Sequence, residues 1–183
     1  MQKFLRQIPN MLSVIRLLMI PLFAVLYFSD NSVYLTAGIY ILAWATDILD
    51  GWLARHFGWI TELGKILDPL ADKAMQFIAA LCFTITDRIF LFLLIPLVIK
   101  ELTMLVGALI IIRTQKLVEP SHWYGKFASA FIFVCSVVLI LIRNNAVLNT
   151  VLCFMMLAVM LFALVMYYIK DFKGKYNLSL KRK

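Results

Sequence analysis

The stretch from Asp47 to Asp72, DILDGWLARHFGWITELGKILDPLAD, holds four aspartates in a chain of 183 residues that is 63% hydrophobic. Asp47 and Asp50 are three positions apart, and Asp68 and Asp72 are four positions apart. Both spacings place the two side chains of a pair on one face of an α-helix. The stretch therefore predicts two antiparallel helices, each with a carboxylate pair, joined by the short loop Phe57–Leu63.

Apolar runs recur along the whole chain, and each is long enough to cross a hydrocarbon core of about 30 Å as a helix. This composition excludes an ordinary soluble domain. We predict an all-α polytopic membrane protein in which residues 1–183 form a single domain. Its six transmembrane helices are expected at Met11–Ser29, Val33–Ala54, Leu67–Thr86, Ile89–Ile112, Tyr124–Ile142 and Val147–Ile169.

The basic residues predict the orientation of these helices. Six spans put both termini on one side, and most Lys and Arg residues outside the spans lie on that side, including the Lys-rich tail. Only Arg88 and Arg143 are expected on the other side. The positive-inside rule therefore places both termini in the cytoplasm. The expected location is the cell membrane. The net charge of +8 suits an anionic lipid surface better than a nucleic acid.

In this topology the second span ends, and the third begins, at the cytoplasmic face, so the four aspartates converge there. One aspartate at membrane depth costs about 2.5–3.5 kcal/mol, and neighbouring carboxylates repel one another. Two divalent cations would offset both penalties, as in the two-metal sites that catalyse displacement at phosphorus. Oxygen ligands favour Mg²⁺ or Mn²⁺, whereas zinc would call for clustered His and Cys. The alternative is a set of structural polar residues that join two helices.

The residues between the aspartates suit phosphate chemistry. Gly51 and Ala54 leave room for a ligand near Asp50, and Arg55 offers a planar set of donors that matches a phosphate. Thr61 and Gly64 lie in or beside the loop that faces the carboxylates. Arg55 could instead be an interfacial charge, and Gly64 could be only a turn residue.

At this point the sequence resembles a known family. The pattern Asp47-x2-Asp50-Gly51-x2-Ala54-Arg55-x8-Gly64-x3-Asp68-x3-Asp72 agrees with the signature of the CDP-alcohol phosphotransferases at all eight fixed positions. The resemblance extends over six spans and includes IPNMLSVIR, residues 8–16, which is similar to the Pro-Asn-x-Leu-Thr-x-x-Arg opening of bacterial members. Ser13 stands where Thr is usual, which keeps the hydroxyl.

The resemblance implies an enzyme that transfers the phosphatidyl group of a CDP-linked lipid to an alcohol and releases CMP. It implies two Mg²⁺ or Mn²⁺ ions as cofactors and a homodimer as the assembly. By the same resemblance, Asp47, Asp50, Asp68 and Asp72 hold the metals, and Asp72 is also the general base. The implied contacts to the CDP-lipid are Asn10, Ser13, Gly51, Ala54, Arg55, Thr61 and Gly64.

The acceptor alcohol is indicated less directly. The segment LDPLADK, Leu67–Lys73, looks like the branch of the family whose members make phosphatidylglycerophosphate or cardiolipin. Arg113 and Lys126 would favour a phosphorylated acceptor such as glycerol 3-phosphate, although either could be a positive-inside anchor. The branch usually has Arg-Glu in the fourth span followed by Gly-Leu-Arg, whereas this chain has Lys100-Glu101 followed by Gly-Ala-Leu.

Two other functions stay open at this level. A cardiolipin synthase would use phosphatidylglycerol as the acceptor. A cation transporter could use the same carboxylates as an ion site, but transporter sites tend to lie near the midplane between internal repeats. Here the acids are expected at one face, no repeat is visible, and Arg55 would be an unusual neighbour for a cation path.

Overall fold

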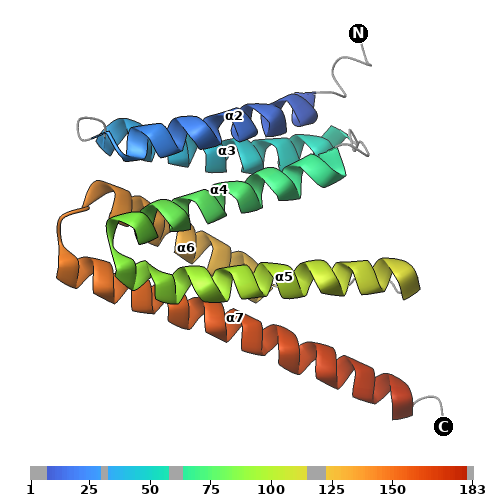
Figure 1. Ribbon diagram of the computed structural model, residues 1–183. Coiled ribbons are helices and arrows are strands. Elements are labelled where there is room, and N and C mark those ends of the chain that lie inside the picture. Colours follow the sequence, from blue (N-terminus) through green and yellow to red (C-terminus); the bar gives the residue numbers. More distant parts are fainter. Residues whose placement is uncertain (1–7, 30–32, 58–63, 115–122, 181–183) are drawn as a thin grey trace. The chain divides into compact units, whose positions relative to one another are not determined.

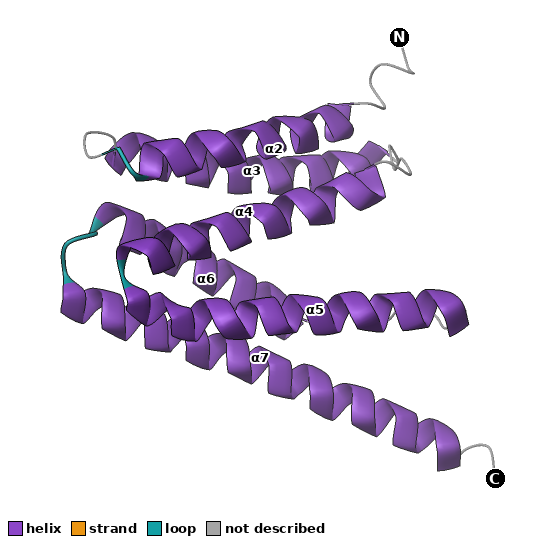
Figure 2. Ribbon diagram, viewed as in Figure 1, coloured by secondary structure: helices purple, strands orange, loops and turns teal. Residues whose placement is uncertain are grey.

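A computed structural model of the chain describes residues 8–29, 33–57, 64–114 and 123–180. Within these residues the structure consists of helices and short loops (Figure 2). The helices are α2 (Ile8–Tyr27), α3 (Val33–Phe57), α4 (Gly64–Thr86), the short 3-10 helix η1 (Arg88–Phe90), α5 (Leu91–Thr114), α6 (Trp123–Leu141) and α7 (Ala146–Leu180). Each of the six apolar runs expected from the sequence lies almost entirely within one α-helix, so the all-α prediction is confirmed.

The helix boundaries differ from the expected ones mainly at the end of the chain. Apolar character ends near Ile169, whereas α7 continues through polar and basic residues to Leu180. Hydropathy marks where a chain leaves lipid and does not mark where a helix stops. At its start, α7 is capped by Asn145, whose side-chain oxygen accepts a hydrogen bond from the Leu148 backbone amide at 3.1 Å.

Three of the helices are long and apolar enough to cross a membrane, counting only the described part of the chain: Asn10–Tyr27, Val33–Leu53 and Ala146–Met166. A shorter apolar stretch covers Gly125–Leu141 in α6. Asp68, Asp72 and Lys73 lie in the first turns of α4, and they shorten the apolar part of that helix. Six spans with cytoplasmic termini therefore remain a prediction.

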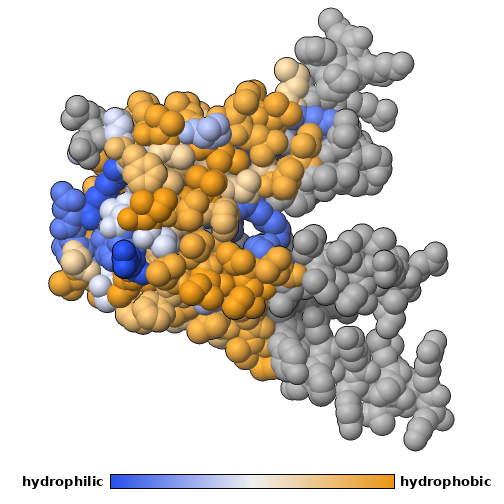
Figure 3. All heavy atoms as spheres, viewed as in Figure 1, coloured by the Kyte–Doolittle hydropathy of each residue, from blue (hydrophilic) through white to orange (hydrophobic). Residues whose placement is uncertain are grey.

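The surface fits a protein that lies in lipid. Large apolar side chains such as Leu18, Val25 and Val147 are more than two-thirds exposed. In Figure 3, apolar residues, coloured orange, cover much of the described surface on the face in view. Exposed apolar area on this scale is unusual for a soluble monomer. A helix satisfies the polar groups of its interior backbone, as a hydrocarbon environment requires.

The chain divides into two compact units, and a single domain over residues 1–183 stays a prediction. The first unit comprises the residues up to Arg88 together with Val137–Arg143. In it, α2 packs along both α3 and α4 (Figure 1). The second unit comprises Ile89–Ser136 and Asn144–Lys183, and in it α5 packs against α7. The Cys153 thiol of α7 lies 3.6 Å from the carbonyl oxygen of Ile89 in this second unit.

The core of the first unit follows one stripe of α2. From Asn10 onward, the buried residues of this helix are Ser13, Arg16, Met19, Phe23 and Tyr27, which are spaced three or four positions apart. This spacing keeps them on one helical face. The stripe is polar at its beginning and aromatic at its end. Its two ends therefore meet different partners.

Aromatic rings fill the core at the later end of that stripe. The Phe23 ring lies 5.5 Å from that of Tyr40 on α3, and the Tyr27 ring lies 5.7 Å from that of Phe83 on α4, between ring centroids. Small residues at buried positions of α3 and α4, among them Ala43, Ala71 and Ala79, line the interfaces. Small side chains allow close approach of helices in membranes. This packing sets the rotation of α3 and α4 about their axes, and hence which side chains they present to α2.

Candidate functional site

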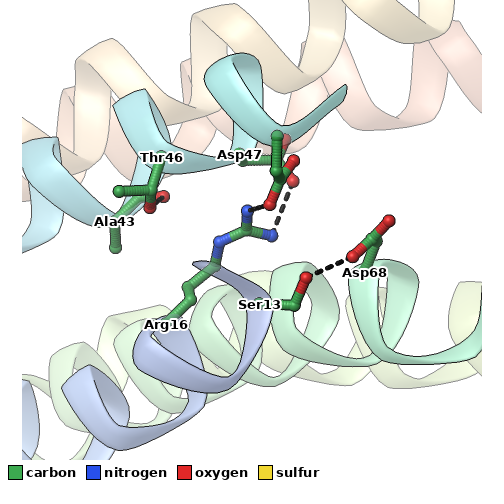
Figure 4. A network of polar contacts seen from close by, with 7 residues as sticks. Ser13, Arg16, Ala43, Thr46, Asp47 and Asp68 are labelled. Carbon is green, nitrogen blue, oxygen red and sulfur yellow. Dashed lines mark hydrogen bonds and ion pairs between the residues drawn. The ribbon is translucent and has the colours of Figure 1, made fainter. Parts of the chain in front are cut away.

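The predicted aspartates lie where three helix segments of the first unit meet. Asp47 and Asp50 are on the last turns of α3, and Asp68 and Asp72 are on the first turns of α4. The polar beginning of the buried stripe on α2 lies beside them. Figure 4 shows the Arg16 side chain reaching from α2 toward Asp47 on α3, and Ser13 beside Asp68 on α4. The site is therefore built on three helices, whereas the sequence motif placed the acids on two.

Arg16 pairs with both carboxylates of α3. Its Nη1 atom lies 2.6 Å from Oδ1 of Asp47, and its Nη2 atom donates a hydrogen bond to Oδ2 of Asp50. Arg16 and Asp50 are each only 1% exposed, whereas the Asp47 side chain is 37% exposed. The guanidinium thus spans from a buried carboxylate to one at the edge of the site.

The pairing of Arg16 with Asp50 has a large effect on stability, because water cannot solvate either of these two buried charges. An arginine inside the hydrocarbon region costs about 2.5–3.5 kcal/mol on insertion scales. Removing one partner of a buried ion pair typically destabilises a protein by about 3–5 kcal/mol, since the other charge is left uncompensated. Arg16 and Asp50 therefore depend on each other for burial, and the pair holds α2 against α3.

Ser13 makes the corresponding contact to α4. Its side chain is fully buried, and its hydroxyl donates a hydrogen bond to Oδ1 of Asp68. Ser13 and Arg16 are three positions apart on α2, so they lie on the same face. One face of α2 therefore contacts three of the four predicted metal-binding aspartates, one through a hydroxyl and two through a guanidinium.

The fourth aspartate, Asp72, lies one helical turn after Asp68 on α4 and is partly exposed. Its spacing of four positions keeps it on the same face as Asp68. Its partial exposure would leave it accessible from outside the core, which is what a group that exchanges a proton with a substrate requires. The role of general base remains a prediction.

The donor chemistry at the site fits a hard divalent cation, because carboxylate oxygens are the ligands that Mg²⁺ and Mn²⁺ prefer. Among the described residues, no three Asp, Glu, His or Cys side chains are grouped closely enough to form a metal site. Arg16 supplies the positive charge next to Asp47 and Asp50 here. The sequence predicted metal cations beside these acids, whereas in the structure a cation of the chain itself, Arg16, pairs with them.

The predicted contacts to the CDP-lipid are described only in part. Asn10 is partly exposed near the start of α2, and Gly51 directly follows Asp50. Ala54 and Arg55 belong to the last turns of α3, and Gly64 begins α4. The surroundings of these three residues, and Thr61 altogether, lie outside the described residues. Ser13 is also a predicted contact, and its hydroxyl donates a hydrogen bond to Asp68.

Aromatic residues follow the carboxylates along α3. The Trp52 and His56 rings stack with their centroids 4.9 Å apart, and the Phe57 ring meets the His56 ring edge-on at 4.8 Å. Trp52 and Phe57 are about half exposed. Amphipathic aromatic rings are typical of the membrane–water interface. Their position within about two turns after Asp50 supports an interfacial depth for the site.

The predicted acceptor residues belong to the second unit. Lys126 is exposed near the start of α6, and Arg113 lies next to the last residue of α5, with its side chain outside the described part of the structure. Lys100 and Glu101 form an ion pair on α5, with 3.3 Å between Nζ and Oε1. Both of these side chains are about one-quarter exposed. A role for any of them in acceptor binding remains a prediction.

Arg16 is the residue of this site that the sequence reasoning did not assign. Two signals could have identified it. An arginine in the middle of an apolar span needs a partner, and its distance of three positions from Ser13 puts both on one face. What could not be read from the sequence is the partner, because Asp47 and Asp50 are 31 and 34 positions away.

Comparisons with known proteins identify the family of the chain. Residues 6–170 match the family described as CDP-alcohol phosphatidyltransferase. The chain is 37% identical over 131 residues to the CDP-diacylglycerol–glycerol-3-phosphate 3-phosphatidyltransferase of Aquifex aeolicus. This match covers 68% of this chain and 70% of that protein. The chain is 32% identical over 126 residues to the protein of the same name from Haemophilus influenzae, covering 66% and 68%.

A further relative has a different name. The cardiolipin synthase (CMP-forming) / mitochondrial hydrolase fusion protein of Schizosaccharomyces pombe is 34% identical over 120 residues. The match covers 66% of this chain and 20% of that protein.

Proposed function

Because this chain belongs to the CDP-alcohol phosphatidyltransferase family, we propose that it transfers the phosphatidyl group of CDP-diacylglycerol to glycerol 3-phosphate. The products are phosphatidylglycerophosphate and CMP. The names of the relatives from Aquifex aeolicus and Haemophilus influenzae support glycerol 3-phosphate as the acceptor. The observation that carries the proposal is the convergence of Asp47, Asp50 and Asp68 on one face of α2.

The reaction is a displacement at the phosphorus of the phosphatidyl group. A hydroxyl oxygen of the acceptor forms a new bond to this phosphorus, and the bond from phosphorus to the pyrophosphate bridging oxygen breaks, so that CMP leaves with the bonding electrons. Asp72, which is partly exposed, accepts the proton of the attacking hydroxyl, the role that the resemblance to the family gives it. Arg55 would contact a phosphate of the CDP-lipid through its planar donors.

Asp47, Asp50, Asp68 and Asp72 would hold two Mg²⁺ or Mn²⁺ ions. When bound, these ions would neutralise the charge that develops on the pyrophosphate oxygens. The carboxylate oxygens are donors that fit such ions, and Ser13 and Arg16 on one face of α2 contact three of the four carboxylates. Positioned carboxylates are what a metal site needs in addition to the correct ligand type.

The enzyme would work at the cytoplasmic face of the cell membrane, with six transmembrane helices and both termini in the cytoplasm. Three apolar helices and an apolar exposed surface support the membrane location. A site at the end of the helices lets the acyl chains stay in lipid while the nucleotide reaches water. A homodimer is proposed only from the resemblance to the family.

The second candidate function is CDP-diacylglycerol-dependent cardiolipin synthesis, with phosphatidylglycerol as the acceptor. The relative from Schizosaccharomyces pombe favours it, since its name includes cardiolipin synthase. The aspartate chemistry is the same for both acceptors, so the choice depends on the acceptor side of the site. The cation transporter is disfavoured because the chain belongs to a family of transferases.

The deciding experiment supplies the purified full chain with CDP-diacylglycerol and, in separate reactions, labelled glycerol 3-phosphate or labelled phosphatidylglycerol. We expect CMP release and labelled phosphatidylglycerophosphate only with the first acceptor. Excess EDTA should abolish the reaction, and Mg²⁺ or Mn²⁺ should restore it. Labelled cardiolipin from the second acceptor would support the second candidate, and full activity in EDTA would contradict the metal chemistry.

A further inference from the structure

We propose that Arg16 is a positioning residue that orients Asp47 and Asp50 for the divalent ions, acting through these carboxylates and not on the substrate. This inference rests on the proposed function, because it takes the aspartates to be the metal ligands. Arg16 is a buried cation of the first predicted span, and it lies outside the four-aspartate signature.

The geometry of the contact supports a positioning role. The two terminal nitrogens of Arg16 bind different carboxylates, and each nitrogen contacts one oxygen of its partner. A carboxylate has two oxygens, so a contact to one of them does not exhaust its capacity to bind a metal. The guanidinium is planar and rigid, and it therefore fixes the separation and the orientation of the two carboxylates.

Because the contact is buried, α3 alone could not hold the carboxylates of Asp47 and Asp50 in place. Arg16 and Asp50 are each 1% exposed, so neither side chain can relax toward water. Without Arg16, Asp47 and Asp50 would repel each other at a spacing of one helical turn. Their side chains would then rotate apart. With Arg16 between them, both carboxylates are held at the interface of α2 and α3.

Ser13 supports the same inference from a second helix. Its hydroxyl holds Asp68 of α4 from the same face of α2 that carries Arg16. The face formed by Ser13 and Arg16 thus contacts carboxylates of two different helices. Groups that orient metal ligands in this way are typically worth about 10- to 100-fold in metal affinity.

The test measures Mn²⁺ binding by the purified full chain, using the electron paramagnetic resonance signal of free Mn²⁺, which does not depend on turnover. The variants are Arg16→Lys and Arg16→Met. Lysine keeps the positive charge but cannot hold two carboxylates at a fixed separation. We expect both variants to bind Mn²⁺ about 10- to 100-fold more weakly than the wild type.

Arg143→Met is the matched control. Arg143 also contacts α2 in the first unit, but it does so at Tyr27, eleven residues beyond Arg16 and roughly 16 Å along the helix. This variant should lower thermal stability and leave Mn²⁺ affinity unchanged. A general loss of packing around α2 would instead weaken Mn²⁺ binding in all three variants.

A second measurement needs no metal. In EDTA, the thermal unfolding of Arg16→Met, Asp47→Asn and the double variant forms a cycle that isolates the coupling between the two residues. We expect the double variant to be less destabilised than the sum of the single variants. Additive effects would overturn the inference, because they would mean that the two side chains do not interact.

The outcomes separate this inference from the proposed function. If the wild type binds Mn²⁺ and releases CMP, but Arg16→Lys binds Mn²⁺ equally well or more tightly, then Arg16 does not orient the ligands and the inference fails alone. Tighter binding would identify Arg16 as a competitor of the metal. If the wild type does not bind Mn²⁺, the proposed metal chemistry fails and this inference fails with it. Arg16→Lys keeps the test decisive if Arg16→Met does not fold.

Discussion

The hydroxyl of Ser13 on α2 donates a hydrogen bond to Oδ1 of Asp68 on α4, which lies 55 positions later in the chain. The bond joins the first predicted span to the third at the end where the four aspartates are found. Ser13 is fully buried. Asp68 therefore receives a donor that water cannot replace once the hydroxyl is removed.

We expect Ser13→Ala to reduce kcat/KM for CMP release by roughly 10- to 150-fold, because a hydrogen bond to a charged group is worth about 1.5–3 kcal/mol. Ser13→Thr is the matched control, since it keeps the hydroxyl, and it should stay close to the wild type. Assays of CMP release at saturating Mg²⁺ compare the variants. An alanine variant as active as the threonine variant would show that the bond does not support the site.

Asp72→Asn should abolish turnover while leaving the protein folded, since the change is nearly isosteric but removes the ability to accept a proton. Asp87→Asn is the control, because Asp87 follows α4 at its other end, roughly 22 Å from Asp72 along the helix. Single-turnover CMP release gives the rates, and thermal unfolding reports the fold. If Asp72→Asn retained a large part of the wild-type rate at saturating substrate, the general base would have to be another residue.

Arg143→Met should destabilise the first unit at the end of α2 away from the aspartates. The Arg143 guanidinium lies 4.1 Å from the centroid of the Tyr27 ring and donates a hydrogen bond to the Tyr27 carbonyl. Loss of both contacts should lower the free energy of unfolding by about 1–3 kcal/mol.

Tyr27→Phe is the informative comparison for this contact. It keeps the ring and the carbonyl, and it loses only the hydrogen bond that Thr86 donates to the Tyr27 hydroxyl at 3.2 Å. Its effect on unfolding should therefore be smaller than that of Arg143→Met. The reverse order would mean that the Thr86 bond, and not the arginine, stabilises this end of the unit.

The acceptor residues give a prediction about selectivity. Glycerol 3-phosphate carries about two negative charges near neutral pH, so fixed cations should contribute to its binding. Arg113→Ala and Lys126→Ala should each raise the KM for glycerol 3-phosphate by roughly 10- to 150-fold, and raise the KM for the CDP-lipid much less.

Arg88→Ala serves as the control for these two variants, since its predicted position is on the opposite side of the membrane. Initial rates with one substrate varied at a time give both KM values. Equal changes for both substrates would show that Arg113 and Lys126 do not mark the acceptor side. Activity with phosphatidylglycerol alone would reassign them to the phosphate of a lipid headgroup.

The sequence by itself determined the helices and the chemistry of the signature. Apolar runs of about 20 residues place a helix wherever the chain must satisfy its backbone in lipid, and α2, α3 and α4 lie where those runs predicted. The spacing from Asp47 to Asp50 and from Asp68 to Asp72 is local, so helical periodicity was enough to put each pair on one face. The ends were less predictable, because α7 continues to Leu180 beyond its apolar part.

Only the tertiary structure decided what the aspartates contact. The partners of Arg16 lie 31 and 34 positions away, and that of Ser13 lies 55 positions away. Such pairs depend on how far each helix is rotated about its axis, and the packing of Phe23, Tyr40 and small residues such as Ala43 sets that rotation. Sequence periodicity defines a face of each helix but not the neighbour that the face meets. For this reason a buried arginine could be recognised as needing a carboxylate, while the choice of Asp47 and Asp50 required the folded arrangement of α2 against α3.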